Sequence, residues 1–248
     1  MKVFVIIPAA GLGTRMAPPS AAKAKKKAAP TKQFKELGGV PILVHTLRVF
    51  ANTPAVYEIV VALRKNEIAG FRNQLEKQFP EILNKRLQIV EGGEHRQNSV
   101  ANAMANLAAD PEDLVLVHDA VRPFVTPEII LHVIEAVEKH HAAIAGWPAV
   151  DTVKQVERTA EGAVIKATIP RASIVMAQTP QGFRYDILKK AFDDAAADGF
   201  LGTDEASLIE RAGLPVVVVM GSAKNIKITT PADMELAEFY LKSNEAIH

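Results

Sequence analysis

A loop close to the N-terminus has residue types that hold phosphates. The loop PAAGLGTRM spans residues 8–16, follows an apolar run, and contains Gly11, Gly13 and Arg15. Glycines and alanines allow backbone N–H groups to approach a phosphate or a base closely, and the arginine adds positive charge. A tight strand-to-helix turn flanked by solvated basic residues has a similar composition. The loop therefore indicates phosphate binding without excluding a simple turn.

The same loop departs from the fingerprint of dinucleotide-binding proteins. That fingerprint has a third glycine where this chain has Met16, and an acidic residue about twenty positions further on. Here a lysine-rich segment, Ser20–Pro30, follows instead, and after it comes Lys32. The spacing predicts a nucleotide phosphate site and disfavours a Rossmann dinucleotide cofactor.

A second candidate segment is VHDAVRP, residues 117–123. Asp119 follows a short apolar run that we expect to be a buried strand, and its carboxylate could hold Mg²⁺ beside phosphate oxygens. Arg122 could bind a phosphate through two N–H groups. The structural alternatives are that Asp119 caps a helix or pairs with Arg122. His118 is expected to pack or to hydrogen-bond, not to catalyse.

Three further segments place polar residues where chemistry is possible. In EGGEHRQNS (91–99) the glycines suggest contact between the main chain and a flat ligand, while Arg96 and Ser99 are equally consistent with a helix start. Thr203 precedes two acidic residues and is expected to cap a helix. Lys227 is expected in a short apolar strand, where its amine must reach a partner or the cleft.

The elements that must position these residues alternate between two patterns. Short β-rich apolar runs are typical of parallel strands buried on both faces, and the segments between them have helical periodicity. One helix is predicted to start at Thr126, and another at Thr230 with Met234, Leu236 and Ala237 buried. The pattern predicts a doubly wound α/β fold whose mostly parallel sheet binds ligands at the carboxyl ends of its strands. The expected strands are Val3–Ile7, Glu58–Leu63, Leu87–Val90, Leu114–His118, Ala142–Trp147 and Val216–Met220.

The segment Asp151–Pro170 breaks this alternation. It reads as two short strands around a turn at Thr159–Gly162, with no helix attached. Because an isolated two-stranded hairpin is marginally stable in water, we expect this one to pack on something. We expect residues 1–248 to form one domain in which residues 150–173 are an extended β-arm.

Composition and charge exclude several classes of protein. The 248 residues carry 29 Lys+Arg and 28 Asp+Glu, which leaves a net charge of +1 and no global field that would attract nucleic acid or a membrane surface. The absence of cysteine excludes disulfides, thiolate metal sites and cysteine nucleophiles. No apolar run approaches the roughly 18 residues of a membrane span. These features predict a cytoplasmic protein.

Taken together, the motifs resemble those of the 2-C-methyl-D-erythritol 4-phosphate cytidylyltransferase family of the non-mevalonate isoprenoid pathway. The likeness runs from Val3 to about Leu241, which is nearly the whole chain. PAAGLGTRM with TKQ, GGEHRQNSV, VHDAVRP, DTVK, AQTPQGF, TDEAS and NIKIT occur in the order of the family. The glycine loop alone indicates only a nucleotidyltransferase, but the combination is highly specific.

The resemblance implies a Rossmann-like nucleotidyltransferase fold, a reaction and a set of site residues. The phosphate of the acceptor would attack the α-phosphorus of CTP in line and release pyrophosphate, with Mg²⁺ present. The implied catalytic residues are Arg15, Lys32, Asp119 and Lys227, with Asp119 at the metal. Residues around the cytosine, ribose and phosphates of CTP would be Ala9, Ala10, Gly11, Gly13, Gly93, Glu94 and Ser99. Those around the acceptor would be Arg122, Thr152, Arg171, Thr203 and Lys227.

The resemblance also implies a homodimer. In the family the hairpin arm crosses to the neighbouring subunit, so Thr152 and Arg171 would serve the site of the partner.

This chain departs from the family at two points. The segment Ala17–Thr31 is longer than usual, and Thr31 stands where a proline is common. The added lysines form either a positive lid over the triphosphate or a solvated loop.

Two other functions remain open at this stage. A ribitol 5-phosphate cytidylyltransferase shares the glycine loop and the late lysine. A CTP-binding regulatory module would bind the nucleotide without turnover.

Overall fold

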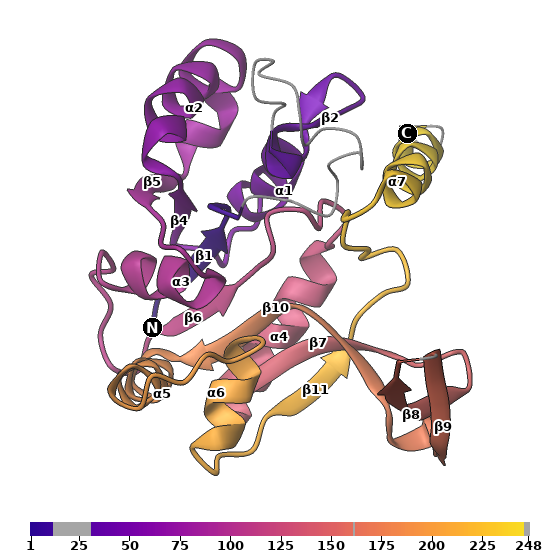
Figure 1. Ribbon diagram of the computed structural model, residues 1–248. Helices are drawn as coiled ribbons and strands as arrows, with labels where there is room; N and C mark the ends of the chain where they lie inside the picture. The colour runs from indigo at the N-terminus through magenta and orange to yellow at the C-terminus, as the bar shows by residue number, and fades with distance from the viewer. Residues whose placement is uncertain (12–30, 161, 246–248) are drawn as a thin grey trace.

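The computed structural model describes residues 1–11, 31–160 and 162–245. Its centre is a seven-stranded sheet in the order β11-β7-β10-β6-β1-β4-β5 (Figure 1). Two pairs of strands lie outside it, β2 with β3 and β8 with β9. The strands are β1 (Val3–Pro8), β2 (Glu36–Leu37), β3 (Val40–Pro41), β4 (Glu58–Leu63), β5 (Arg86–Glu91), β6 (Leu114–Val117), β7 (Ala142–Pro148), β8 (Val153–Thr159), β9 (Gly162–Ile169), β10 (Val175–Arg184) and β11 (Val217–Met220). The helices are α1 (Ile42–Ala51), α2 (Lys65–Gln78), α3 (Arg96–Met104), α4 (Pro127–His140), α5 (Tyr185–Ala197), α6 (Glu205–Arg211) and α7 (Pro231–Glu245).

The sheet is mostly parallel, as predicted. β1 pairs in parallel with β4 on one side and with β6 on the other, and β4–β5 and β11–β7 are also parallel. The exception is β10, which runs antiparallel to both β6 and β7. The sequence did not predict this strand, because its buried half, Thr179–Phe183, has no continuous apolar run. Since the chain leaves β1 toward β4 and later returns to its other side at β6, a crevice forms at the carboxyl end of β1.

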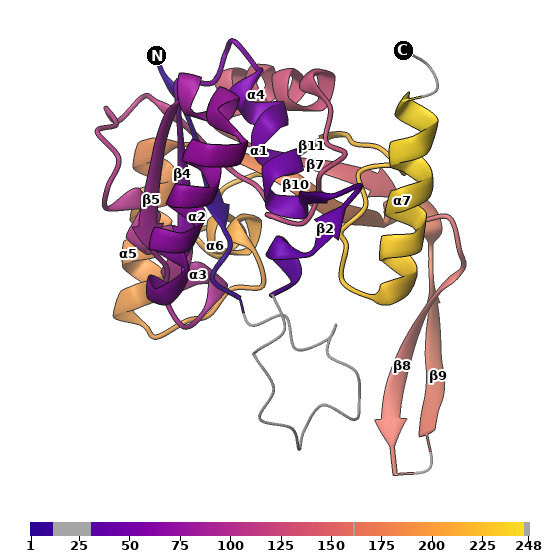
Figure 2. The same cartoon turned by 90° about the horizontal axis from the view of Figure 1, so that it is seen from above.

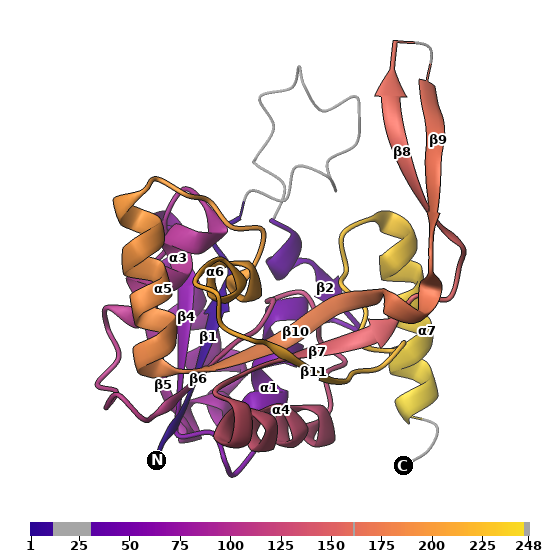
Figure 3. The same ribbon diagram turned by 90° about the horizontal axis from the view of Figure 1, so that it is seen from below.

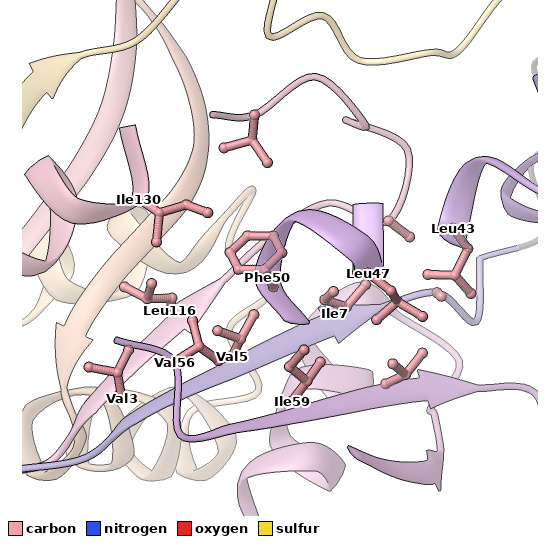
Figure 4. Packing of buried hydrophobic residues seen from close by; sticks show 14 of the residues in the cluster. Val3, Val5, Ile7, Leu43, Leu47, Phe50, Val56, Ile59, Leu116 and Ile130 are labelled. Atoms are coloured by element: carbon pink, nitrogen blue, oxygen red, sulfur yellow. The ribbon is translucent and has the colours of Figure 1, made fainter. Parts of the chain in front are cut away.

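Side chains of β1 alternate between two cores, as a doubly wound sheet requires. Val5 and Ile7 pack on one face with residues of α1, α2 and α4, whereas Phe4 and Ile6 pack on the other with residues of α3, α5 and α6. Figure 4 shows the first face, where Phe50 of α1 lies among side chains of the strands. The central strands β1, β4 and β6 are near-continuously apolar because both of their faces are covered. The apolar run of β11 was expected to be buried as well, but this strand lies at the edge of the sheet and leaves Val218 and Met220 exposed.

The two predicted helix starts are confirmed. Thr126 caps α4 by accepting a hydrogen bond from the backbone N–H of Ile129, at 3.4 Å. At α7, Thr230 Oγ1 accepts from the N–H of Asp233, and Asp233 Oδ2 accepts in return from the N–H of Thr230, at 2.8 Å. Reciprocal bonds of this kind satisfy N–H groups that the first helical turn leaves without partners.

Two predictions in the C-terminal region are wrong. In α7, Ala237 is buried but Leu236 is 40% exposed, because the helix touches only a small third core that contains Leu37 and Ile228. Residues 225–229 form no strand. This segment is instead held to the main chain of Val121 by the N–H of Ile228, at 2.9 Å.

The predicted hairpin is present as β8 and β9. The strands pair from Val153 with Ile169 to Thr159 with Gly162, and a register shift follows Gln155. Figures 2 and 3 show the hairpin extending away from the central sheet, beyond α7. Nearly all of its side chains are exposed in the single chain. What it packs on, and the organisation of residues 1–248 as one domain with an arm, stay predictions.

None of the helices in the described parts of the chain combines the length and apolar character needed to cross a bilayer.

Candidate active site

A pocket opens where β1 and β6 end. Small residues from the loop after β1 form one side, and the segment between β5 and α3 forms another. Asp119 comes from the loop after β6, while Lys32 and Lys227 approach from segments distant in the sequence. The lining residues are Pro8, Ala9, Ala10, Gly11, Lys32, Gln33, Gly93, Glu94, His95, Arg96, Ser99, Asp119, Ala120, Val121 and Lys227.

Nine of the site residues that the family resemblance implies line this pocket. Before folding they are spread over more than two hundred positions, and the carboxyl edge of the sheet brings them together. They are Ala9, Ala10, Gly11, Lys32, Gly93, Glu94, Ser99, Asp119 and Lys227.

The remaining predicted residues either fall outside the described residues or do not line the pocket. Arg15, Gly13 and the lysine-rich segment 20–30 fall outside the described residues. Arg122 is buried beside the pocket, where its Nη1 donates to the carbonyl of Asn225 at 2.7 Å.

Thr152 and Arg171 are exposed at the base of the hairpin and do not line the pocket of their own chain. Arg171 Nη1 donates to the carbonyl of Val150 at 2.7 Å. Thr203 is also exposed, and the expectation that it caps a helix is wrong. Asp204 caps α6, because its side chain accepts from the N–H of Ser207 at 3.0 Å.

Asp119 is the electrostatic centre of the pocket floor. Its side chain is 9% exposed, and Oδ2 lies 2.9 Å from Lys227 Nζ and 3.3 Å from Arg122 Nε. Oδ1 lies 3.4 Å from Arg96 Nε. Burial alone would raise the pKa of Asp119, but the three neighbouring cations outweigh burial and hold this pKa well below its usual value. Asp119 is therefore an anion at neutral pH, and the expected pairing with Arg122 is one of its roles.

The turn that carries Asp119 is fixed from below by two buried side chains. Thr179 Oγ1 accepts from the N–H of Asp119 at 3.0 Å and lies 3.1 Å from His118 Nδ1. His118 Nε2 lies 3.1 Å from the carbonyl oxygen of Arg122. A carbonyl only accepts, so Nε2 carries the proton and Nδ1 accepts from the Thr179 hydroxyl. The chain of bonds thus holds both ends of the Asp119–Arg122 turn.

His118 is a structural residue, as the sequence predicted. Its ring is fully buried against Phe50, and burial lowers its pKa to about 4. The imidazole is neutral at physiological pH and does not line the pocket.

Close packing explains the two glycines at the start of α3. A Cβ on Gly92 would lie 2.5 Å from Cβ of Ala10, and a Cβ on Gly93 would overlap Asn98. Ser99 Oγ accepts from the N–H of Gly93 at 3.0 Å and so fixes the loop over the helix start. Contact between this loop and a base stays a prediction.

Lys32 is the first residue of a short 3-10 helix, and the residue after it, Gln33, is held by a hydrogen bond. Gln33 is buried, and its Nε2 donates to the carbonyl of Ala9 at 2.6 Å. This bond joins the segment after residue 30 to the loop after β1. Lys32 therefore enters the pocket from a fixed point, whatever the length of the segment before it.

The sequence analysis missed a buried ion pair next to Asp119. Arg96 Nη1 donates to both carboxylate oxygens of Glu205, at 2.6 and 2.7 Å, and Glu205 is 1% exposed. Burial alone would lower the pKa of Arg96, but the charges of Glu205 and Asp119 raise it. Both residues lie in motifs that the sequence analysis identified, GGEHRQNSV and TDEAS. Their pairing was not predictable because 109 positions separate them.

Within residues 1–11, 31–160 and 162–245, no three His, Asp or Glu side chains form a cluster able to hold a metal ion. Asp119 supplies a single carboxylate on the pocket floor. That donor set fits Mg²⁺ in the way it often binds to proteins, through one carboxylate with the remaining positions filled by substrate phosphates and water.

Comparison with known proteins agrees with this geometry. The family model for 2-C-methyl-D-erythritol 4-phosphate cytidylyltransferase (IspD) matches residues 3–243. A protein of that name from Acidobacterium capsulatum is 56% identical over 246 residues, which cover 99% of this chain and 100% of the relative. The namesake from Solibacter usitatus is 51% identical and covers 99% of this chain and 98% of its own length.

Solved structures match as well. The crystal structure of the Francisella tularensis enzyme of the same name superposes with a TM-score of 0.77 at 36% identity, covering 96% of this chain and 99% of that one. The synthase from Anaerococcus prevotii gives 0.77 at 30% identity, with 97% and 98% covered. The matches extend over the sheet, the pocket and the hairpin, and this chain belongs to the 2-C-methyl-D-erythritol 4-phosphate cytidylyltransferase family.

Proposed function

We propose that this chain transfers the cytidylyl group of CTP to 2-C-methyl-D-erythritol 4-phosphate, giving 4-diphosphocytidyl-2-C-methyl-D-erythritol and pyrophosphate. One observation carries the proposal. Lys32, Asp119 and Lys227, from three separate segments, line one pocket at the carboxyl end of β1. Such a pocket supplies positive charge where two anions have to meet.

The acceptor needs no general base. A phosphomonoester, with a second pKa near about 6, is mostly a dianion at neutral pH and is itself the nucleophile. Its oxygen attacks the α-phosphorus of CTP, the new P–O bond forms, and the bond to the β-phosphate oxygen breaks to release pyrophosphate. A buried neutral His118, held by Thr179, is consistent with a mechanism in which no histidine moves a proton.

The main obstacle is repulsion between the substrates. Two like unit charges about 4 Å apart repel by roughly 4 kcal/mol at an effective dielectric constant of about 20. Lys32 and, from outside the described residues, Arg15 would hold the triphosphate and stabilise charge at the pentacoordinate phosphorus. Lys227 would hold the acceptor phosphate next to Asp119.

Asp119 would hold Mg²⁺ together with the phosphates of CTP. Bound there, the ion would supply positive charge to the phosphate oxygens. Lys227 lies 2.9 Å from the same carboxylate oxygen, so Asp119 also orients the amine that faces the acceptor.

Selection of cytosine would come from the main chain. Ala10 and Gly93 both line the pocket, where their backbone groups would meet the amine and ring nitrogen of the base, and Ala9 and Gly11 line it as well. Glu94 and Ser99 would lie at the ribose. UTP should be rejected by several kcal/mol, because buried groups that bind N4 and N3 of cytosine would be left unpaired.

The hairpin would complete the site of a second subunit. β8 and β9 expose apolar side chains such as Val164 and Ile165, which a partner would cover. Thr152 and Arg171 would then reach the acceptor in the neighbouring pocket, and Thr203 would lie close to it. The protein would thus be a homodimer joined through the β-arm, and the cytoplasmic location expected from the sequence stays a prediction.

A substrate panel tests the proposal. The protein is given CTP and Mg²⁺ with either methylerythritol phosphate or ribitol 5-phosphate, and pyrophosphate release is followed. We expect turnover with methylerythritol phosphate and little with ribitol 5-phosphate. Preference for ribitol 5-phosphate would assign the other acceptor, and binding of CTP without any turnover would contradict both enzymatic functions.

A further inference from the structure

Glu205 has no part in the proposed reaction, yet it is the most completely buried acid beside the pocket. It is the first residue of α6 and lies on the opposite side of Arg96 from Asp119. Both of its oxygens accept from Arg96 Nη1, at 2.6 and 2.7 Å. Burying a carboxylate is costly, so its presence here calls for a partner of opposite charge, and Arg96 is that partner.

Arg96 contacts two carboxylates, and its bonds to Glu205 are shorter than its contact with Asp119. It makes two short bonds to Glu205 but only one long contact to Asp119, 3.4 Å from Nε to Oδ1. A guanidinium that is free to choose normally binds a carboxylate through two parallel bonds of about 2.7–2.9 Å. Glu205 therefore holds Arg96 at this longer distance from Asp119, and the charge of Arg96 still contributes to the low pKa of Asp119.

Glu205 is itself held in place. Gln181 of β10 donates from Nε2 to Asp204 Oδ2 at 2.7 Å, and its Oε1 accepts from the N–H of Ala206 at 3.1 Å. These bonds fix the residues on either side of Glu205. The start of α6 is thus anchored to the central sheet, and the Glu205 carboxylate has a defined position.

We propose that Glu205 is a positioning residue: by binding Arg96 through both carboxylate oxygens, it keeps the guanidinium from closing onto Asp119 and so leaves Asp119 able to accept a divalent cation that arrives with the nucleotide triphosphate. The inference rests on the proposed function, because it assumes that Asp119 holds Mg²⁺ in the CTP complex.

Calorimetric binding of CTP, with and without Mg²⁺ and with no acceptor present, tests this role apart from turnover. The quantity measured is the ratio of the two dissociation constants, which reports how much Mg²⁺ strengthens CTP binding. In Glu205→Gln the anchor of Arg96 loses its charge, so Arg96 moves onto Asp119. We expect the ratio to fall by about tenfold, the scale of coupling between groups in contact.

Asp113→Asn is the matched control. Asp113 is also a buried carboxylate, but it accepts hydrogen bonds from the N–H groups of Lys2 and Asp110 and does not line the pocket. Its substitution should lower the melting temperature and leave the ratio unchanged. An equal fall of the ratio in Asp113→Asn would assign the effect of Glu205→Gln to general loss of stability and overturn the proposal.

A double variant of Arg96 and Glu205 provides a second test in case the Glu205→Gln protein does not fold. Removing both members of a buried ion pair is tolerated better than removing one. The double variant of Arg96→Met with Glu205→Gln has neither a guanidinium that could close onto Asp119 nor an unpaired buried charge, so its ratio should stay close to that of the wild type. A clear fall of the ratio in the double variant would mean that Glu205 acts by another route and would overturn the proposal.

The results separate this inference from the function on which it rests. Wild-type protein that does not bind CTP would contradict the proposed function. Wild-type protein that binds CTP equally with and without Mg²⁺ would remove the metal from Asp119 and the role of Glu205 with it. A clear Mg²⁺ effect that is the same in wild type and Glu205→Gln would overturn the positioning role alone.

Discussion

Around Asp119, polar side chains are buried and joined to one another, whereas along β8 and β9 nearly every side chain is exposed. Asp119 has three cations within 3.4 Å, and its turn is tied to Thr179 and His118. The hairpin has its own backbone ladder and ion pairs on its surface, such as the one between Lys166 and Glu157.

This difference indicates which parts of the proposed site a single chain can form without a partner subunit. The pocket floor is fixed within the subunit, because Asp119 is bonded to Arg96, Thr179 and Lys227, which come from three other segments of the chain. Among the described residues, the polar contacts of β8 and β9 lie within the hairpin itself, and Arg171 at its base does not line the pocket around Asp119. One region is therefore a preorganised centre, and the other is the element that would contact a second subunit in the proposed homodimer.

The largest effect is expected from Lys32→Ala. Loss of one preorganised donor to developing charge should lower kcat by on the order of 10²–10³-fold, with a smaller change in the KM for CTP. Lys65→Ala, which removes an exposed lysine outside the pocket, is the control. A kcat close to the wild-type value in Lys32→Ala would falsify the assignment of Lys32 to the transition state.

The next largest effect is expected on the free energy of unfolding as the pH is lowered. Unfolded His118 takes up a proton below its ordinary pKa of 6.5, whereas the buried ring resists protonation until about pH 4. The unfolded state thus binds more protons in this range, and acid lowers the free energy of unfolding. Between pH 7.5 and 5 the loss from this group should be roughly 2 kcal/mol.

Urea unfolding at several pH values measures this loss. In His118→Gln the slope over the same range should become clearly shallower, although the variant is less stable overall. His140→Gln changes an exposed histidine and should keep the wild-type slope. If His118→Gln also kept it, burial of the neutral ring would not be the source of the acid sensitivity.

Arg171→Ala tests the hairpin. If Arg171 binds the phosphate of the acceptor, loss of a hydrogen bond to a charged group should raise the KM for methylerythritol phosphate by about tenfold or more and leave the KM for CTP nearly unchanged. Arg158→Ala, further out on the same arm, should change neither value. A rise in the KM for CTP would place Arg171 at the nucleotide instead.

Mixed dimers then decide which subunit Arg171 serves. The assay uses an acceptor concentration well below KM, where Arg171→Ala chains alone have little activity. When inactive Lys32→Ala chains are mixed with Arg171→Ala chains, arm exchange gives each hybrid one intact site, and random mixing should restore about a quarter of wild-type activity. No recovery after subunit exchange would show that the arm serves its own chain.

The smallest effect is expected on the hairpin surface. The ion pair between Lys166 and Glu157 is more than half exposed on both sides. Lys166→Met should therefore change the free energy of unfolding by less than about 0.5 kcal/mol in urea. A cost of several times that amount would mean that the pair is buried in the assembled protein, which would sharpen the case for a partner over this face.

The elements of the fold were largely predictable, and the reason is periodicity. Strands such as β4 and helix α4 follow from apolar spacing and a threonine cap. β10 was missed because polar residues fill its buried part, where Thr179 and Gln181 satisfy other segments instead of a core.

The site was predictable only as far as local motifs reach. Asp119 was predicted because it directly follows an expected strand. Two of the cations that contact its carboxylate come from helix α3 and from the segment near residue 227, which the spacing of the motifs does not connect to it. The pairing of Arg96 with Glu205 depends on two elements that meet only in the folded chain. Contacts between residues so far apart in the sequence cannot be predicted from the spacing of motifs.

The most direct test of the central claim is a crystal structure of the protein with CTP and Mg²⁺ bound. The account predicts that the triphosphate lies between Lys32 and Asp119, with the cytosine between the main chains of Ala10 and Gly93. A nucleotide bound away from this pocket, or one whose phosphates lie far from Asp119, would contradict it.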